Sequence, residues 1–132
     1  MSQEIEVNLL EQIVCLEKEA ADFGFQWETT QQIMAQIQSE CLEVDEHLKA
    51  AGDKINRAAL QEEMGDLLHA VFSLCVFCGM SPEETLANTL SKFDKRLKSV
   101  QSIAKEQGYA HLKGKTFEEL MAFWNEAKRR VG

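Results

Sequence analysis

The sequence predicts an all-α fold, a compact bundle of about five helices around a four-helix core. Apolar residues recur with helical period along most of the chain, and alternating or β-branched runs, which are typical of strands, are missing. Gly52, Gly79 and Gly108 each follow a periodic segment, where helices commonly end. With 132 residues, 45% hydrophobic side chains and one proline, residues 1–132 are expected to form a single globular domain.

The expected helices cover residues 3–22, 30–51, 54–78, 82–107 and 117–130. Two of their starts have a clear capping signal. Ser81 is a favourable N-cap before Pro82, with Glu84 at the third helical position, and Thr116 with Glu119 forms the pattern of a capping box.

Charge limits the classes of partner. The net charge of −8 argues against non-specific nucleic-acid binding. Its distribution is uneven, because residues 1–90 carry 4 basic and 17 acidic side chains while residues 91–132 carry 10 basic and 5 acidic ones. The basic final third is therefore able to meet phosphates locally or to pair with the acidic part.

A cytoplasmic protein is expected. No apolar run approaches the length of about 20 residues that a membrane-spanning helix needs, and the acidic N-terminus lacks the basic region of a secretory signal. The four cysteines are spread over different helical faces, as expected for free thiols in a reducing compartment. Cys75 and Cys78 form a CxxC, but it lies inside an apolar helix, so core packing is favoured over redox or zinc chemistry.

Two expected helices each carry a pair of carboxylates beside an apolar face. Glu40 and Glu43 are three residues apart, about 60° around the helix, and border the stripe Ile33, Ile37, Cys41, Val44 and Leu48. Glu63 and Asp66 have the same spacing and border the stripe Leu60, Leu67, Val71, Leu74 and Cys78. The angles place Glu63 nearer the buried face than Glu62. If the two helices pack antiparallel, the pairs can converge.

Four converging carboxylates would repel one another and lose solvation unless a cation bound among them. Ligation by oxygen alone suits Mg²⁺, with Mn²⁺ as a second possibility, and Mg²⁺ recruits substrate phosphates. The competing interpretation is a solvated helix face, on which acid pairs three residues apart are common, or acids placed favourably near a helix N-terminus.

The motifs resemble those of a known family. "ECLE", followed about twenty residues later by "EEMGD", is similar to the EExxE and EExxD motifs of the MazG family of all-α nucleoside triphosphate pyrophosphohydrolases. "GFQWETTQ" resembles the loop of that family at Trp27, Glu28 and Gln31. "NTLSKFDKR" resembles its N-x-x-x-K-F-x-x-R motif, and "ELMAFWNEAK" its closing helix. The likeness covers roughly residues 24–130.

This resemblance implies that Glu40, Glu43, Glu63 and Asp66 ligate Mg²⁺ and are catalytic. It also implies a substrate-binding set of Trp27, Gln31, Asn88, Lys92 and Arg96. The expected reaction is hydrolysis of a nucleoside triphosphate between the α and β phosphates to a monophosphate and pyrophosphate, in a house-cleaning role. Gln26 and Glu28 depart from the loop of the family, which bears on base recognition and not on the reaction. Ser39 stands where the first motif usually has its leading Glu, which bears only on support of the metal ligands or on a second metal.

Several further residues are candidates for supporting roles in this reaction. Glu46, Glu62 and His47 are candidates for a general base or for supporting the metal ligands, with an ordinary surface histidine as the favoured interpretation of His47. Lys92 and Arg96 are expected near the β and γ phosphates, and the alternative is a solvated basic face of the helix. Trp27 has two open roles, stacking on the base or anchoring its loop. No chemistry is assigned to His69 or His111.

Helix 54–78 is apolar nearly all round after Asp66, which predicts a central helix and a homodimer or homotetramer that covers it more fully. Three rival functions stay open. A related dimeric dUTPase-like hydrolase would use the same carboxylates. A non-catalytic helical interaction module would not need them, and a di-iron bundle would need Glu-x-x-His on two helices.

Overall fold

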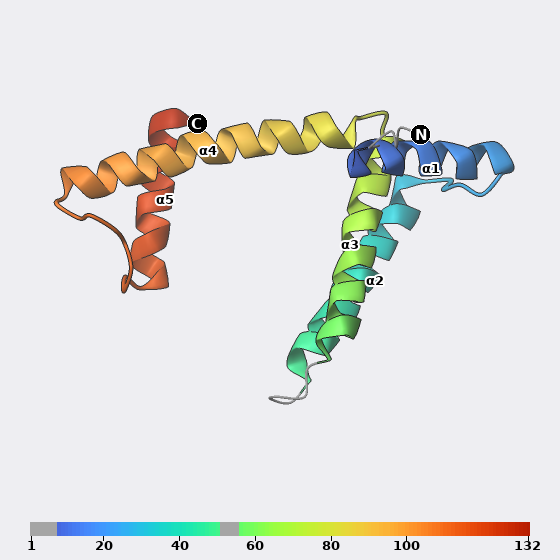
Figure 1. The fold of residues 1–132 in the computed structure, drawn as a ribbon, viewed down its shortest axis with the longest axis horizontal. Helices are drawn as coiled ribbons and strands as arrows, with labels where there is room; N and C mark the ends of the chain where they lie inside the picture. Colours follow the sequence, from blue (N-terminus) through green and yellow to red (C-terminus); the bar gives the residue numbers. More distant parts are fainter. Residues whose placement is uncertain (1–7, 51–55) are drawn as a thin grey trace, which may run out of the picture. The chain divides into compact units, whose positions relative to one another are not determined.

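The structure, a computed structural model, describes residues 8–50 and 56–132, and within these ranges every regular element is helical (Figure 1). This confirms the all-α prediction. The helices are α1 (Leu9–Phe23), α2 (Thr30–Lys49), α3 (Arg57–Phe77), α4 (Pro82–Glu106) and α5 (Phe117–Val131). Predicted and observed helix limits differ by at most one residue wherever the predicted limit is described. The predicted starts at residues 3 and 54, and the end at residue 51, lie outside the described residues.

The predicted helix signals are confirmed where they are described. The Ser81 hydroxyl accepts a hydrogen bond from the Glu84 N–H at 3.1 Å. Thr116 and Glu119 form the reciprocal capping box at the start of α5. Gly79 and Gly108, just beyond α3 and α4, have φ of +73° and +85°, a backbone conformation that favours glycine.

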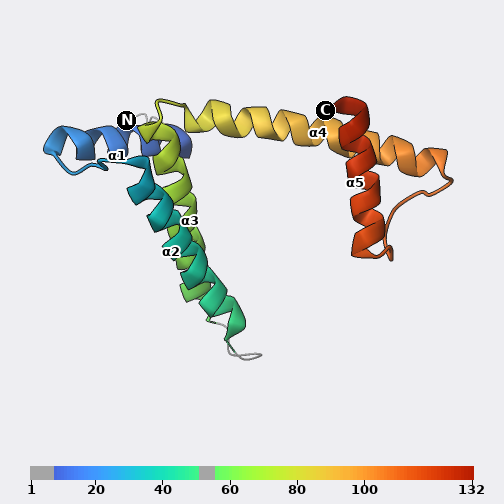
Figure 2. The ribbon, with the colours of Figure 1, turned by 180° about the vertical axis from the view of Figure 1, so that it is seen from behind.

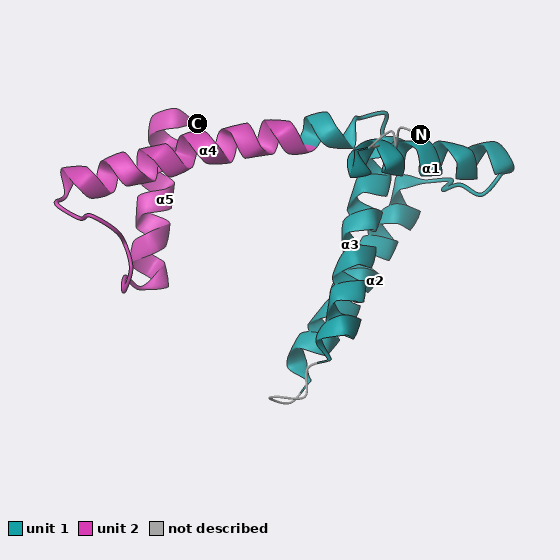
Figure 3. Cartoon of the chain, viewed as in Figure 1, with its two compact units in different colours: residues 1–85 teal, residues 86–132 magenta. Residues whose placement is uncertain are grey.

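The chain divides into two compact units, residues 1–85 and residues 86–132 (Figure 3). Helix α4 begins in unit 1 and continues into unit 2. The four-helix core is not formed within either unit by its described residues. A single domain completed by dimerisation therefore stays a prediction.

Helix α3 is the central helix of unit 1. It packs side by side with α2 in an antiparallel hairpin, and α1 lies across the end of that pair, as both views show (Figures 1 and 2). This is the antiparallel arrangement that convergence of the two acid pairs requires. Burial in α3 is incomplete, because Leu68 is 59% exposed and Val71 is 40% exposed.

The predicted apolar stripes are partly wrong. Ile33 on α2 and Leu60 on α3 are buried, and Ile37, Val44, Leu67 and Leu74 are half-buried. Cys41, Leu48, Val71 and Cys78, however, are exposed. Helical period identifies the apolar face correctly, but a two-helix hairpin crossed by one further helix covers only part of that face.

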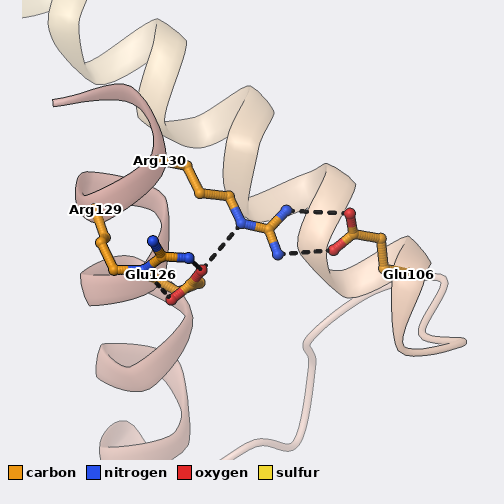
Figure 4. A network of polar contacts seen from close by, with 4 residues as sticks. All are labelled: Glu106, Glu126, Arg129 and Arg130. Carbon is orange, nitrogen blue, oxygen red and sulfur yellow. Dashed lines mark hydrogen bonds and ion pairs between the residues drawn. The ribbon is translucent and has the colours of Figure 1, made fainter.

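Unit 2 has a small core of its own, shared by α4 and α5. Ile103 and Ala104 pack with Phe123 and Ala127. Beside this core, an ionic network joins the two helices (Figure 4). Arg130 pairs with Glu106 at 3.0 Å and with Glu126 at 3.1 Å, and Arg129 also pairs with Glu126.

Within the described residues, no single helix is long and apolar enough to span a membrane, although α3 and α4 meet that criterion jointly as a bent pair.

Candidate active site

The α2–α3 hairpin brings together carboxylates from both acid pairs. One oxygen from each of Glu40, Glu43 and Glu63 lies within 4.8 Å of the others. Glu40 is buried, with 8% exposure, whereas Glu63 is half-buried and Glu43 is exposed. Glu62 is exposed, so the prediction that Glu63 lies nearer the buried face than Glu62 is confirmed.

The electrostatics of this cluster are unfavourable without a cation. Burial raises the pKa of Glu40, and the charges of Glu43 and Asp66 raise it further. Hydrogen bonding to the Glu63 carboxyl, together with repulsion between the two charges, raises the pKa of Glu43. Glu40 and Glu43 therefore hold a proton more tightly than isolated carboxyl groups, and a bound cation would relieve the repulsion between their charges.

Two carboxylate oxygens in the cluster are buried and unpaired. Glu40 Oε2 and Glu63 Oε2 have no hydrogen-bond partner among the described residues, although Gln36 Nε2 donates to the other Glu40 oxygen at 2.7 Å. Unsatisfied buried acceptors are costly, and a metal ion would satisfy them. An all-oxygen donor set suits a hard divalent cation. On this test the residues fit the predicted metal.

Asp66 and His47 border the cluster. The charge of Asp66 raises the pKa of both Glu40 and Glu43, although Asp66 itself is exposed and is not part of the group of three. His47 Nε2 lies 3.9 Å from Glu63 Oε1. Three of the four predicted ligands thus lie together, with the fourth close by.

A cavity of about 610 Å³ adjoins the carboxylates within unit 1. Glu40 and Asp66 form part of its wall, and Trp27, Phe25 and Leu16 contribute apolar surface. Its volume is in the range of about 300–1,000 Å³ that is usual for small-molecule sites. The loop before α2 therefore has a clear structural role, because its aromatic residues line this cavity.

Hydrogen bonds hold one wall of the cavity together. Trp27 Nε1–H donates to Ser73 Oγ at 3.1 Å, and the Ser73 hydroxyl donates to Glu17 Oε1 at 2.9 Å. His69 Nε2 lies 2.9 Å from the same Glu17 oxygen. The loop, α1 and α3 are thereby connected. Trp27 anchors its loop and also lines the cavity, and its stacking on a base stays a prediction.

The remaining predicted substrate-binding residues are not among the side chains that line the cavity of unit 1. Gln31 is exposed on the first turn of α2 and is not one of the lining residues. Asn88 and Lys92 are exposed on α4, and Arg96 donates from Nε to the Gly132 carbonyl at 2.9 Å while lying 5.6 Å from the Trp124 ring centroid. These three belong to unit 2, so their proximity to the carboxylates of unit 1 stays a prediction.

Sequence reasoning did not identify Glu17, Phe25, Gln36, His69 or Ser73, which all line the cavity. His69, to which the sequence assigned no chemistry, shares the wall with Asp66, three residues earlier on α3. A sequence signal existed for both polar positions of α3. Asp66, His69 and Ser73 follow spacings of three and four, which place them on one helix face.

The geometry defines an all-α protein with a carboxylate cluster that could hold a metal ion, beside a cavity of small-molecule size. A family model described as the MazG nucleotide pyrophosphohydrolase domain matches residues 28–101. The chain belongs to the MazG family, which confirms the resemblance drawn from its motifs.

Individual relatives agree with this assignment. The nucleoside triphosphate pyrophosphohydrolase of Escherichia coli (strain K12) is 30% identical over 115 residues, which are 87% of this chain and 43% of that protein. The nucleoside triphosphate pyrophosphohydrolase/pyrophosphatase MazG of Thermotoga maritima is 30% identical over 113 residues, 86% of this chain and 41% of that protein. The uncharacterized protein YabN of Bacillus subtilis (strain 168) is 38% identical over 69 residues, 52% of this chain and 14% of that protein. The chain thus spans less than half the length of these relatives.

Proposed function

We propose that this protein is a Mg²⁺-dependent nucleoside triphosphate pyrophosphohydrolase that cleaves between the α and β phosphates. The products are a nucleoside or deoxynucleoside monophosphate and pyrophosphate. The observation that carries the proposal is the convergence of Glu40, Glu43 and Glu63, with two unpaired buried oxygens, beside a cavity of about 610 Å³. Family membership and the printed names of the relatives from E. coli and T. maritima support it.

In this proposal Glu40, Glu43, Glu63 and Asp66 hold the metal, with Mn²⁺ as a possible substitute for Mg²⁺. When bound, a divalent cation supplies charge neutralisation at the phosphates and acidifies a bound water. The carboxylates would hold the cation and would thereby determine where the phosphates bind. His47, 3.9 Å from Glu63, is positioned to orient that carboxylate.

The substrate's two ends would be held by different parts of the chain. Trp27 presents its ring to the cavity, whose apolar wall suits a base and sugar. Gln31, at the start of α2, would contact the same end. Asn88, Lys92 and Arg96 would approach the β and γ phosphates, where cationic side chains stabilise the charge of the leaving pyrophosphate.

Assembly is part of the proposal. We infer that residues 1–132 act as one domain within a homodimer or homotetramer, in the cytoplasm, with no nucleic-acid or membrane partner. Support comes from the exposed apolar row on α4, formed by Leu86, Leu90, Phe93 and Leu97, which a second copy would cover. Free thiols at all four cysteines agree with a reducing compartment.

The decisive experiment resolves the reaction products. The purified chain is incubated with ribo- and deoxynucleoside triphosphates and Mg²⁺, and monophosphate with pyrophosphate is distinguished from diphosphate with phosphate. Release of monophosphate and pyrophosphate is expected. Turnover of dUTP alone would favour the dUTPase-like alternative. Absence of turnover on every substrate, with no stabilisation by Mg²⁺, would favour the interaction module.

A further inference from the structure

We propose that Glu17 on α1 makes this site selective for nucleotides whose base carries an exocyclic amino group, and that it disfavours uracil and thymine. The inference rests on the proposed function, because it assigns the cavity to the base. Glu17 lies outside residues 28–101, the segment that matches the family model, and no sequence motif pointed to it.

The position of Glu17 is fixed by two donors on one oxygen. Ser73 Oγ and His69 Nε2 each lie 2.9 Å from Glu17 Oε1. Because an ionised carboxylate only accepts hydrogen bonds, His69 must carry its proton on Nε2 to make this contact. The two lone pairs of Oε1 are then occupied, and the carboxylate is held in one orientation.

The second oxygen of Glu17 remains available to an occupant of the cavity. No described residue donates to Oε2, and the Glu17 side chain, 19% exposed, is largely shielded from solvent. The neighbouring donors already have acceptors, because the Trp27 N–H donates to Ser73 Oγ and the Ser73 hydroxyl donates to Glu17 Oε1. This part of the wall therefore offers an acceptor to an occupant of the cavity.

The same cavity connects Glu17 to the metal site. Glu17, Ser73 and Trp27 share its wall with Glu40 and Asp66. A nucleotide with its phosphates at the carboxylate cluster would extend its base along Trp27 toward Glu17. Base recognition and phosphate binding thus fall at different places in one cavity.

An acceptor in this position discriminates between bases by chemistry. Cytosine and adenine carry an amino group that donates hydrogen bonds, whereas thymine has a carbonyl oxygen at the corresponding edge, as does uracil. Where the exocyclic position of the base faces the carboxylate, an amino group donates to it, whereas a carbonyl in the same place would oppose two acceptors. Sites built to hydrogen-bond one substrate group reject analogues that lack it more strongly than apolar pockets reject size differences.

The test compares cytidine with uridine nucleotides, which differ only at this edge. We expect the native chain to have a kcat/KM for CTP above that for UTP by on the order of tenfold or more. In Glu17→Gln the amide can donate to the carbonyl, so the ratio should fall to within about twofold. The matched control is Glu19→Gln, on an exposed position of α1, which should keep the native ratio.

Binding of CMP and UMP, measured by calorimetry on the native chain, provides a readout that needs neither turnover nor a variant. Tighter binding of CMP supports the proposal, and equal binding overturns it. Hydrolysis of CTP and UTP at equal kcat/KM would also overturn it while leaving the proposed function intact. Failure of the proposed function looks different, because no nucleotide would then release pyrophosphate.

Discussion

Glu63 is the candidate metal ligand that burial, geometry and charge support most consistently. It supplies an unpaired buried oxygen and lies within the carboxylate cluster. Glu63→Gln removes one charge, so kcat should fall by on the order of 10²-fold or more as the metal is lost. Steady-state kinetics across Mg²⁺ concentrations check this. Glu19 on α1, exposed and outside the cluster, offers a control, and Glu19→Gln should keep activity within about twofold.

The same substitution has a second, thermodynamic signature. Mg²⁺ at one hundred times its Kd should stabilise the native chain by about 2.7 kcal/mol, because it binds the folded state alone. Glu63→Gln should lose this gain, while its stability without metal should be equal or higher, since one source of repulsion is gone. Thermal unfolding with and without Mg²⁺ measures both quantities. A preserved Mg²⁺ effect would remove Glu63 from the ligand set.

A substitution at Lys92 distinguishes a phosphate-binding role from a solvated basic face of α4. It is exposed and makes no ion pair with another described residue, so its charge is available to a substrate. We expect Lys92→Ala to lower kcat/KM by roughly tenfold, as loss of one charge-assisted contact would. Lys105→Ala, near the end of the same helix, should have little effect. Equal kinetics for both variants would assign Lys92 to the solvated face.

At the scale of elements, the network between α4 and α5 makes the stability of unit 2 depend on pH. The guanidinium groups of Arg129 and Arg130 lower the pKa of Glu126 to about 2. A carboxyl whose folded pKa is depressed stabilises the fold above its unfolded pKa of about 4.5, and this contribution is lost as pH falls toward 2. Helicity measured from pH 7 to pH 2 should fall as this stabilisation by the ionised carboxylate is lost.

Glu126→Gln isolates that contribution. The variant should be less stable than the native chain at pH 7 and nearly equal to it at pH 2, because the native carboxyl is then losing its charge. Asp94→Asn removes a carboxylate that pairs with one lysine at an exposed site. The stability difference between this variant and the native chain should therefore change less between pH 7 and pH 2. A constant gap between native chain and Glu126→Gln across pH would show that the carboxylate's charge is not responsible.

At the scale of the whole molecule, the apolar row of α4 predicts self-association. Leu90, 57% exposed, is the most accessible member. Light scattering should give two or four times the chain mass of 15.0 kDa, and Leu90→Glu should shift this toward the monomer. Ser91→Glu, one position along the helix and also exposed, should leave the mass unchanged. A native monomer at micromolar concentration would contradict the predicted assembly.

What the sequence determined by itself was local or periodic. Helix limits at Ser81 and Thr116 depend on caps a few residues long, and the spacing of Glu40 with Glu43 and of Glu63 with Asp66 depends on the helical repeat. These features need no knowledge of what packs against them. For the same reason, the preference for Glu63 over Glu62 was correct, since it depended only on angle around one helix.

Tertiary structure alone decided which of these features meet. The antiparallel pairing of α2 and α3 brings Glu40, Glu43 and Glu63 together, and the crossing of α1 places Glu17 against His69 and Ser73. Helical period could not show either contact, because it records which face of a helix is apolar and not which helix covers it. Val71 and Cys78 are exposed for the same reason, because a residue of an apolar stripe is buried only where another helix packs over it.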